Sequence, residues 1–123
     1  MIKIKQFLYF IRYKDQDSLN LPFYISVQDL FKGIIAFILD LNVSDYNDLF
    51  KCEGYPNRQR QKIMRESRLI DLCIDCLAYP FITGMFEYDD LTQQHPITRI
   101  SQLIYRILKH CVKDYTINKN YVA

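Results

Sequence analysis

Glycine and proline are scarce in this chain, and so are net charge and long apolar runs. Three Gly and four Pro among 123 residues, half of which are hydrophobic, exclude a disordered or low-complexity segment. The formal net charge of +2 is small for a general nucleic-acid binder, so any basic function must come from local clustering. The longest apolar run, Ile34 to Leu39, is far shorter than the roughly twenty residues that span a bilayer, so we expect no membrane span here.

Signatures of catalysis are also missing. The sequence has no glycine-rich phosphate loop. Pairs such as Ser67 with His110, or Asp89 with Asp90, have no neighbouring group in the sequence that would activate them. We therefore expect a protein that is not an enzyme.

The N-terminus superficially resembles a signal peptide, with two lysines before a short apolar stretch, Phe7 to Ile11. Arg12 ends that stretch early and no small-residue cleavage site follows, so we expect an amphipathic helix. Four cysteines without a secretory signal predict reduced thiols in a cytosolic environment.

A zinc site is the alternative interpretation of these cysteines. Cys73 and Cys76 are spaced like the start of such a site, which Cys111, His95 or His110 could complete. However, Cys73 and Cys111 each fall on the apolar stripe of an expected helix. The pattern therefore favours buried thiols and no metal.

Apolar residues recur at three- and four-residue spacing through most of the chain, which predicts an all-α fold. Phe23 to Ile25 is an ambiguous strand at most, and residues 42–56 read as a connector. The first expected helix covers about residues 2–13, and the second runs from an N-cap at Ser26 to Leu39. A third, short helix starts at Asn57, and a break near Ser67 separates it from a fourth, also short. The last runs from Pro96 to about Lys113.

Residues 118–123 predict the opening of a further helix at the end of the chain. A domain seldom stops one turn into an element, so we expect a truncated piece of a larger structure. Short helices joined by turns fit either a compact bundle or an armadillo-like stack, in which each unit buries a face on its neighbours.

Three cations, Arg58, Lys62 and Arg65, lie four and three residues apart and so share one face of the expected helix. Pro56 and Asn57 place the first of them beside the helix start, where backbone N–H groups have no partner within the helix. A helix start with a basic face suits a phosphate, because Arg pairs with phosphate oxygens bidentately and Lys offers a compact charge. The simpler alternative is a solvated helix face.

The same block, NRQRQKIMRE over residues 57–66, resembles the signature helix of inositol 1,4,5-trisphosphate receptors. Further blocks follow in order and at compatible spacing: Ala78 to Phe81, residues 104–110 with Asp114 and Tyr115, and residues 120–123. The resemblance covers residues 54–123 well and 26–53 loosely. It divides the chain into N-terminal helices over 1–53 and a partial helical ligand-binding domain over 54–123, of the armadillo-like RIH type shared with ryanodine receptors.

The resemblance also implies a site. In the family, residues matching Arg58, Lys62 and Arg65 contact the phosphates of the inositol ring, and the hydroxyl of a tyrosine matching Tyr115 helps to hold one of them. The next two positions are basic in typical receptors, whereas this chain has Thr116 and Ile117. Each charge-assisted hydrogen bond is worth about 1.5–3 kcal/mol, so the resemblance implies weaker binding here.

In the family, a β-trefoil domain before the helical domain supplies the other half of the pocket. The resemblance therefore implies half a binding site for inositol trisphosphate, in the cytosolic part of a tetrameric calcium release channel of the endoplasmic reticulum membrane. Ligand binding would draw the two halves together and pass the movement toward the pore. The alternative is a cytoplasmic, stand-alone helical scaffold with a vestigial or absent phosphate site.

Overall fold

The computed structural model describes residues 2–40, 55–82 and 95–123, and every regular element within these ranges is a helix. The all-α prediction is therefore confirmed. In chain order the helices are α1 (Ile2–Arg12), α2 (Leu21–Ile38), α3 (Arg58–Glu66), α4 (Leu69–Ile82), α5 (Pro96–Val112) and α6 (Thr116–Val122).

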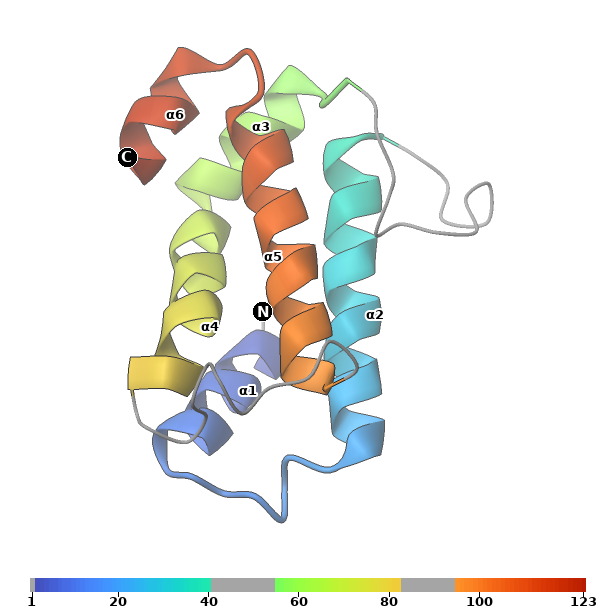
Figure 1. The fold of residues 1–123 in the computed structure, drawn as a ribbon. Coiled ribbons are helices and arrows are strands. Elements are labelled where there is room, and N and C mark those ends of the chain that lie inside the picture. The colour runs from blue at the N-terminus through green and yellow to red at the C-terminus, as the bar shows by residue number, and fades with distance from the viewer. Residues whose placement is uncertain (1, 41–54, 83–94) are drawn as a thin grey trace.

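The helices stack around an apolar core (Figure 1). α2 and α5 lie side by side, run in the same direction and make the most extensive contact between any two helices. α4 packs on α5 and on α1, while α3 crosses the end at which α2 and α5 finish, with α6 beside it. The fully buried side chains of the core include Phe7, Phe31, Ile35, Met64, Ile70, Ile104 and Ile107.

Several predicted helix boundaries are confirmed. The Asn57 side chain accepts a hydrogen bond from the N–H of Arg60 at 3.2 Å, which caps α3. α3 and α4 are separated by Ser67 and by Arg68, whose φ of 63° lies in the left-handed region, as the expected break requires. His95 caps α5, because its Nδ1 accepts from the N–H of Ile97 at 3.1 Å.

The predicted start of α2 is wrong. The helix begins at Leu21, because the Asn20 side chain accepts a hydrogen bond from the N–H of Phe23 at 3.0 Å and Pro22 lies in the first turn. Ser26 therefore lies inside α2, where its hydroxyl accepts a hydrogen bond from the ammonium of Lys3. The ambiguous strand at Phe23 to Ile25 is helical as well.

The last helix also starts earlier than predicted, at Thr116 rather than at residue 118. Asp114, with a φ of 54°, turns the chain between α5 and α6. Of the expected connector over residues 42–56, all but the last two residues lie outside the described residues.

Among the described helices, α2 is long and apolar enough to cross a bilayer by length and composition. This property is weak evidence for a membrane span, because the core helix of a folded domain shares it. One side of α2 is such a core face, since Val27, Phe31 and Ile35 are fully buried.

Candidate anion-binding site

The predicted basic face lies on α3, whose first turn is fastened to the C-terminal end of α2. The N–H of Asn57 donates to the Ile38 carbonyl at 2.7 Å. The Arg60 guanidinium donates to the Phe37 carbonyl at 2.8 Å and pairs with the Asp40 carboxylate at 3.1 Å. Carbonyls in the last turn of a helix have no partner within that helix and carry partial negative charge. α3 therefore supplies both donors and positive charge to the end of α2.

A buried hydrogen-bond network fastens α3 to the end of α5 in the same manner. The Gln61 amide donates to the carbonyls of His110 and Lys113, each at 2.9 Å. The Asn118 amide donates to the Cys111 carbonyl at 2.9 Å and to the Gln61 carbonyl at 2.8 Å. Gln61 and Asn118 are both fully buried, so these bonds are shielded from water. They fix α6, and the turn that precedes it, against α3.

This turn brings Tyr115 onto the basic face. The guanidinium carbon of Arg58 lies 4.3 Å from the centroid of the Tyr115 ring, and that of Arg65 lies 5.8 Å from it. Both distances are in the range of a cation–π interaction. Arg58 also donates to the Asp114 carbonyl, and Arg65 donates to the Asn118 amide oxygen at 3.2 Å. Three of the four predicted site residues therefore meet, although they come from distant parts of the chain.

Lys62, the fourth predicted residue, lies at the exposed edge of this cluster. Its ammonium is 3.8 Å from a carboxylate oxygen of Glu66, and the same oxygen is 3.9 Å from the Arg65 guanidinium. A carboxylate thus lies near two of the three cations. The Lys62 and Glu66 side chains are about half exposed, so their mutual attraction is weak.

The cluster keeps donors for an anion. A guanidinium has five N–H donors, so the bond of Arg58 to Asp114 and that of Arg65 to Asn118 leave several N–H groups in each. Thr116 and Ile117, which follow the tyrosine, are both exposed in the first turn of α6 and bring no further positive charge.

Sequence reasoning missed Gln61, Asn118 and Glu66. The sequence does indicate the positions of two of these residues. Gln61 lies at helical spacing between Arg58 and Arg65, and Glu66 lies four residues after Lys62. It does not indicate that of Asn118, because its partners are backbone carbonyls brought together by the fold.

α6 has a second attachment beyond this network. The Tyr121 hydroxyl donates to the carboxylate of Asp71, on α4, at 2.6 Å. This hydrogen bond raises the pKa of Tyr121, because it stabilises the protonated phenol.

The three cysteines within the described residues are buried, as predicted. Cys73, Cys76 and Cys111 all lie in the core as thiols without a disulfide, and burial raises the pKa of Cys73 and of Cys111 to about 12. Across residues 2–40, 55–82 and 95–123, no group of three or more His, Cys, Asp or Glu side chains could hold a metal ion. Cys52, Asp89 and Asp90 lie outside the described residues.

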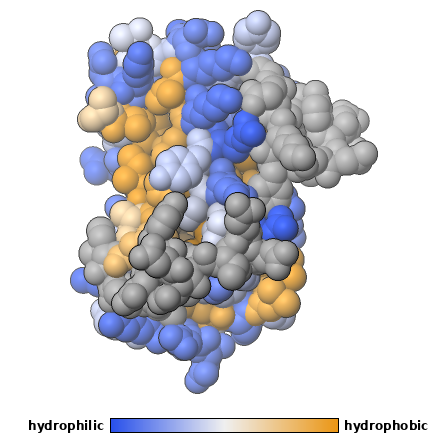
Figure 2. Space-filling view, viewed as in Figure 1, coloured by the Kyte–Doolittle hydropathy of each residue, from blue (hydrophilic) through white to orange (hydrophobic). Residues whose placement is uncertain are grey.

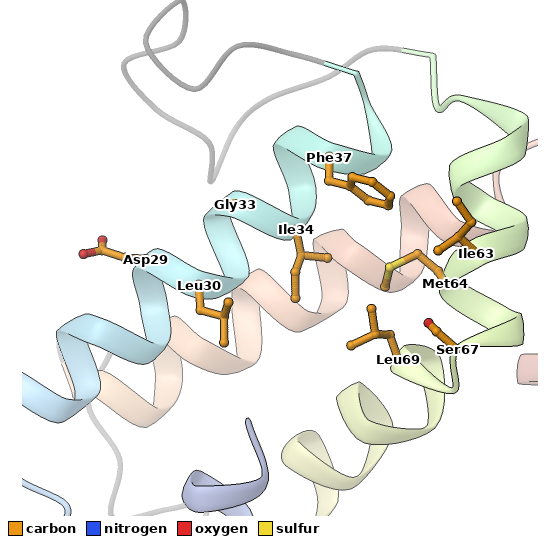
Figure 3. Close-up of a pocket in the computed structure, with 9 residues that line it drawn as sticks. All are labelled: Asp29, Leu30, Gly33, Ile34, Phe37, Ile63, Met64, Ser67 and Leu69. Carbon is orange, nitrogen blue, oxygen red and sulfur yellow. The ribbon is translucent and has the colours of Figure 1, made fainter. Parts of the chain in front are cut away.

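An apolar groove of about 440 Å³ lies between α2 and the junction of α3 with α4 (Figure 3). It includes Ser67, one of the residues considered as a nucleophile, and none of the four predicted site residues. Its lining is Asp29, Leu30, Gly33, Ile34, Phe37, Ile63, Met64, Ser67 and Leu69. The groove and the basic cluster are therefore separate features of α3.

The chain matches a known protein family. Residues 28–123 match the family model of the RIH domain, RYDR_ITPR. The match covers most of the chain, and the chain belongs to this family of helical domains from inositol trisphosphate and ryanodine receptors. The match begins within the N-terminal segment, and the division of the chain at residue 54 stays a prediction.

Proposed function

Taking membership of the RIH-domain family as the premise, we propose that this chain contributes the α-helical half of an inositol phosphate pocket. The observation that carries the proposal is the meeting of Arg58 and Arg65 of α3 at the ring of Tyr115. Lys62 lies exposed on the same helix. These are the four residues that the resemblance to inositol trisphosphate receptors assigns to phosphate binding.

The chemistry of the cluster supports an anionic ligand. Each guanidinium retains N–H donors that match the geometry of phosphate oxygens, and the Lys62 ammonium can turn toward a second phosphate. The tyrosine ring restricts the position of the nearer guanidinium, which lowers the entropy lost when a ligand orders it.

Affinity in this chain is expected to be low. Thr116 and Ile117 replace two cations of the typical pocket, at a cost of about 3–6 kcal/mol in binding free energy if each supplied one charge-assisted hydrogen bond. A β-trefoil partner domain would provide the remaining phosphate contacts.

The wider role follows from the family. On this proposal the segment faces the cytosol in a tetrameric calcium release channel of the endoplasmic reticulum membrane. It binds ligand and passes movement on, without a catalytic step. A pocket that closes on its ligand shifts the helical stack from its open toward its closed conformation, and the stack passes this movement toward the pore.

An amide NMR titration with inositol 1,4,5-trisphosphate tests the proposal. We expect weak shifts, centred on Arg58, Lys62, Arg65 and Tyr115, that Arg58→Gln with Lys62→Gln abolishes while helicity by circular dichroism is kept. The matched control is Lys5→Gln with Arg12→Gln, which removes the same charge from α1. Lys62→Gln alone provides a milder variant, because its side chain is exposed and contributes little to folding. Shifts that are absent, or that are spread over all surface cations, would refute the proposed site.

A second function has an observation in its favour. All three arginines of α3 bond to groups of the same chain. Arg60 donates to the end of α2, Arg58 to the turn after α5, and Arg65 to Asn118 of α6. Such bonds fit a helical scaffold whose basic face is structural. If the parent shows no phosphate response but Arg58→Gln lowers its stability, the scaffold function is favoured.

A further inference from the structure

α1 has an exposed face that neither the core nor the basic cluster explains. The helix buries one side, formed by Ile4, Phe7 and Ile11. On the opposite side Ile2, Tyr9 and Tyr13 are 78, 58 and 62% exposed. Their spacing places Ile2 and Tyr9 in one row along α1, and Tyr13, in the turn that follows the helix, continues this row.

Aromatic rings gather along this row. Tyr9 lies 4.6 Å from Tyr13 and 6.1 Å from Phe10, measured between ring centroids. A shallow hollow of about 390 Å³ runs beside them, and its lining is Ile2, Lys5, Gln6, Tyr9 and Phe10. The exposed face therefore combines apolar area with hydroxyl and amide groups.

The same segment carries charge of one sign. Residues 2–14 contain four cations, Lys3, Lys5, Arg12 and Lys14, and no acidic residue, although the whole chain is close to neutral. Lys5 and Arg12 are exposed and lie seven residues apart, on one edge of the aromatic row. This segment precedes the part of the chain that matches the RIH domain.

We propose that this face of α1 docks on the surface of a bilayer that contains anionic lipids. Its two cations meet the lipid headgroups, the tyrosines lie at headgroup level, and Ile2 reaches the acyl boundary, as in helices that lie in the plane of a membrane. The proposal is independent of the phosphate site on α3.

α1 is already positioned to present this face. The Lys3 ammonium donates to the Ser26 hydroxyl of α2, and the Phe10 ring packs edge-on against Phe23 at 5.2 Å. Docking therefore needs no folding step, and the entropy cost of ordering a segment is avoided.

The chain has no tryptophan, so Tyr9→Trp gives a single reporter on this face. The test mixes the full chain with vesicles of phosphatidylcholine, with or without phosphatidylserine. We expect a blue-shifted emission and co-sedimentation with the anionic vesicles. Lys5→Gln with Arg12→Gln should weaken the association by roughly tenfold or more. The charge-matched control, Lys109→Gln with Lys119→Gln at two exposed positions of α5 and α6, should bind like the parent.

Three outcomes would overturn the proposal. In the first, anionic vesicles neither sediment the chain nor shift the Tyr9→Trp emission. In the second, the control pair weakens binding as much as the α1 pair, which would indicate attraction by overall charge. In the third, an acidic peptide such as polyglutamate shifts the emission and the vesicles do not, which would identify a protein partner for this face.

Discussion

The α2–α5 interface and the α3–α6 junction are built from different interactions. Between α2 and α5 the buried side chains are aliphatic or aromatic, such as Phe31, Ile35 and Ile104. At the junction the buried contacts include the hydrogen bonds of Gln61 and Asn118. On the face in Figure 2, hydrophobic residues lie between α4 and α5, and mostly hydrophilic residues lie over α3 and α6.

This difference separates stability from the arrangement of the site. Apolar burial is large and non-directional, so it holds α2 and α5 together without specifying where a particular polar group lies. Hydrogen bonds are smaller in net free energy but depend on direction, so they fix the turn that carries Tyr115. We expect damage to the first region to unfold the domain, and damage to the second to release α6.

Phe31→Ala should have the largest effect. Phe31 is fully buried in α2, and its truncation leaves a cavity that costs about 3–5 kcal/mol in the free energy of unfolding. Urea unfolding followed by circular dichroism measures the change. The control, Tyr105→Ala on the exposed side of α5, should change stability by about 0.5 kcal/mol or less. A cost for Phe31→Ala close to that of the control would show that stability lies elsewhere.

Asn118→Ala should have a smaller and more local effect. The substitution removes both hydrogen bonds that the Asn118 side-chain amide donates, and it leaves the Cys111 carbonyl without that donor. The expected cost is about 1–3 kcal/mol in the free energy of unfolding. Hydrogen exchange should show amides of α6 losing protection while those of α2 keep theirs. Asn120→Ala, an exposed site on α6, is the matched control. If α6 stays as protected as in the parent, the network does not hold the junction.

If the cluster binds phosphate, Glu66→Gln tests whether the Glu66 carboxylate competes with the ligand for the cations. The substitution removes a carboxylate that lies 3.8 Å from Lys62 and 3.9 Å from Arg65. Exposed helix pairs contribute about 0.3–0.5 kcal/mol, so affinity for inositol trisphosphate should rise roughly twofold in an NMR titration. Asp29→Asn makes the same charge change on α2 and should leave affinity unchanged. Unchanged binding in Glu66→Gln would mean that this carboxylate does not compete with the ligand.

Tyr121→Phe should give the smallest effect, a loss of stability that is present at neutral pH and disappears at high pH. Asp71 raises the pKa of Tyr121 in the folded state. The hydrogen bond between them therefore stabilises the fold below the ordinary tyrosine pKa of about 10, and this stabilisation is lost as pH rises through the raised pKa. The thermal midpoint of the variant should therefore fall less steeply than that of the parent above pH 10. Tyr105→Phe is the control and should follow the parent. Parallel curves for parent and Tyr121→Phe would rule out this linkage.

Much of the helical layout could be predicted from local signals. Helices do start after Asn57 and at Pro96, and the break near Ser67 is present. The start of α2 was mispredicted because Asn20 with Pro22 is a stronger start signal than Ser26. The Asn20 and Pro22 signal is present in the sequence, but the prediction considered Ser26 alone.

The candidate site could be predicted less completely. Helical spacing places Arg58, Lys62 and Arg65 on one side of α3, but it does not show that two of them meet Tyr115 while the third lies beside Glu66. That outcome depends on the turn at Asp114 and on the buried Asn118. The spacing of residues along the sequence does not predict these contacts, because the partners are distant in the chain.

The sequence by itself determined the helical class, most of the caps and the family, since periodicity and capping act within a few residues. Only the tertiary structure decided which polar groups reach the ends of α2 and α5, and where Tyr115 lies on the basic face. The physical reason is that the apolar core sets the distances between helices. Those distances then determine which side chains from distant segments come within hydrogen-bonding reach.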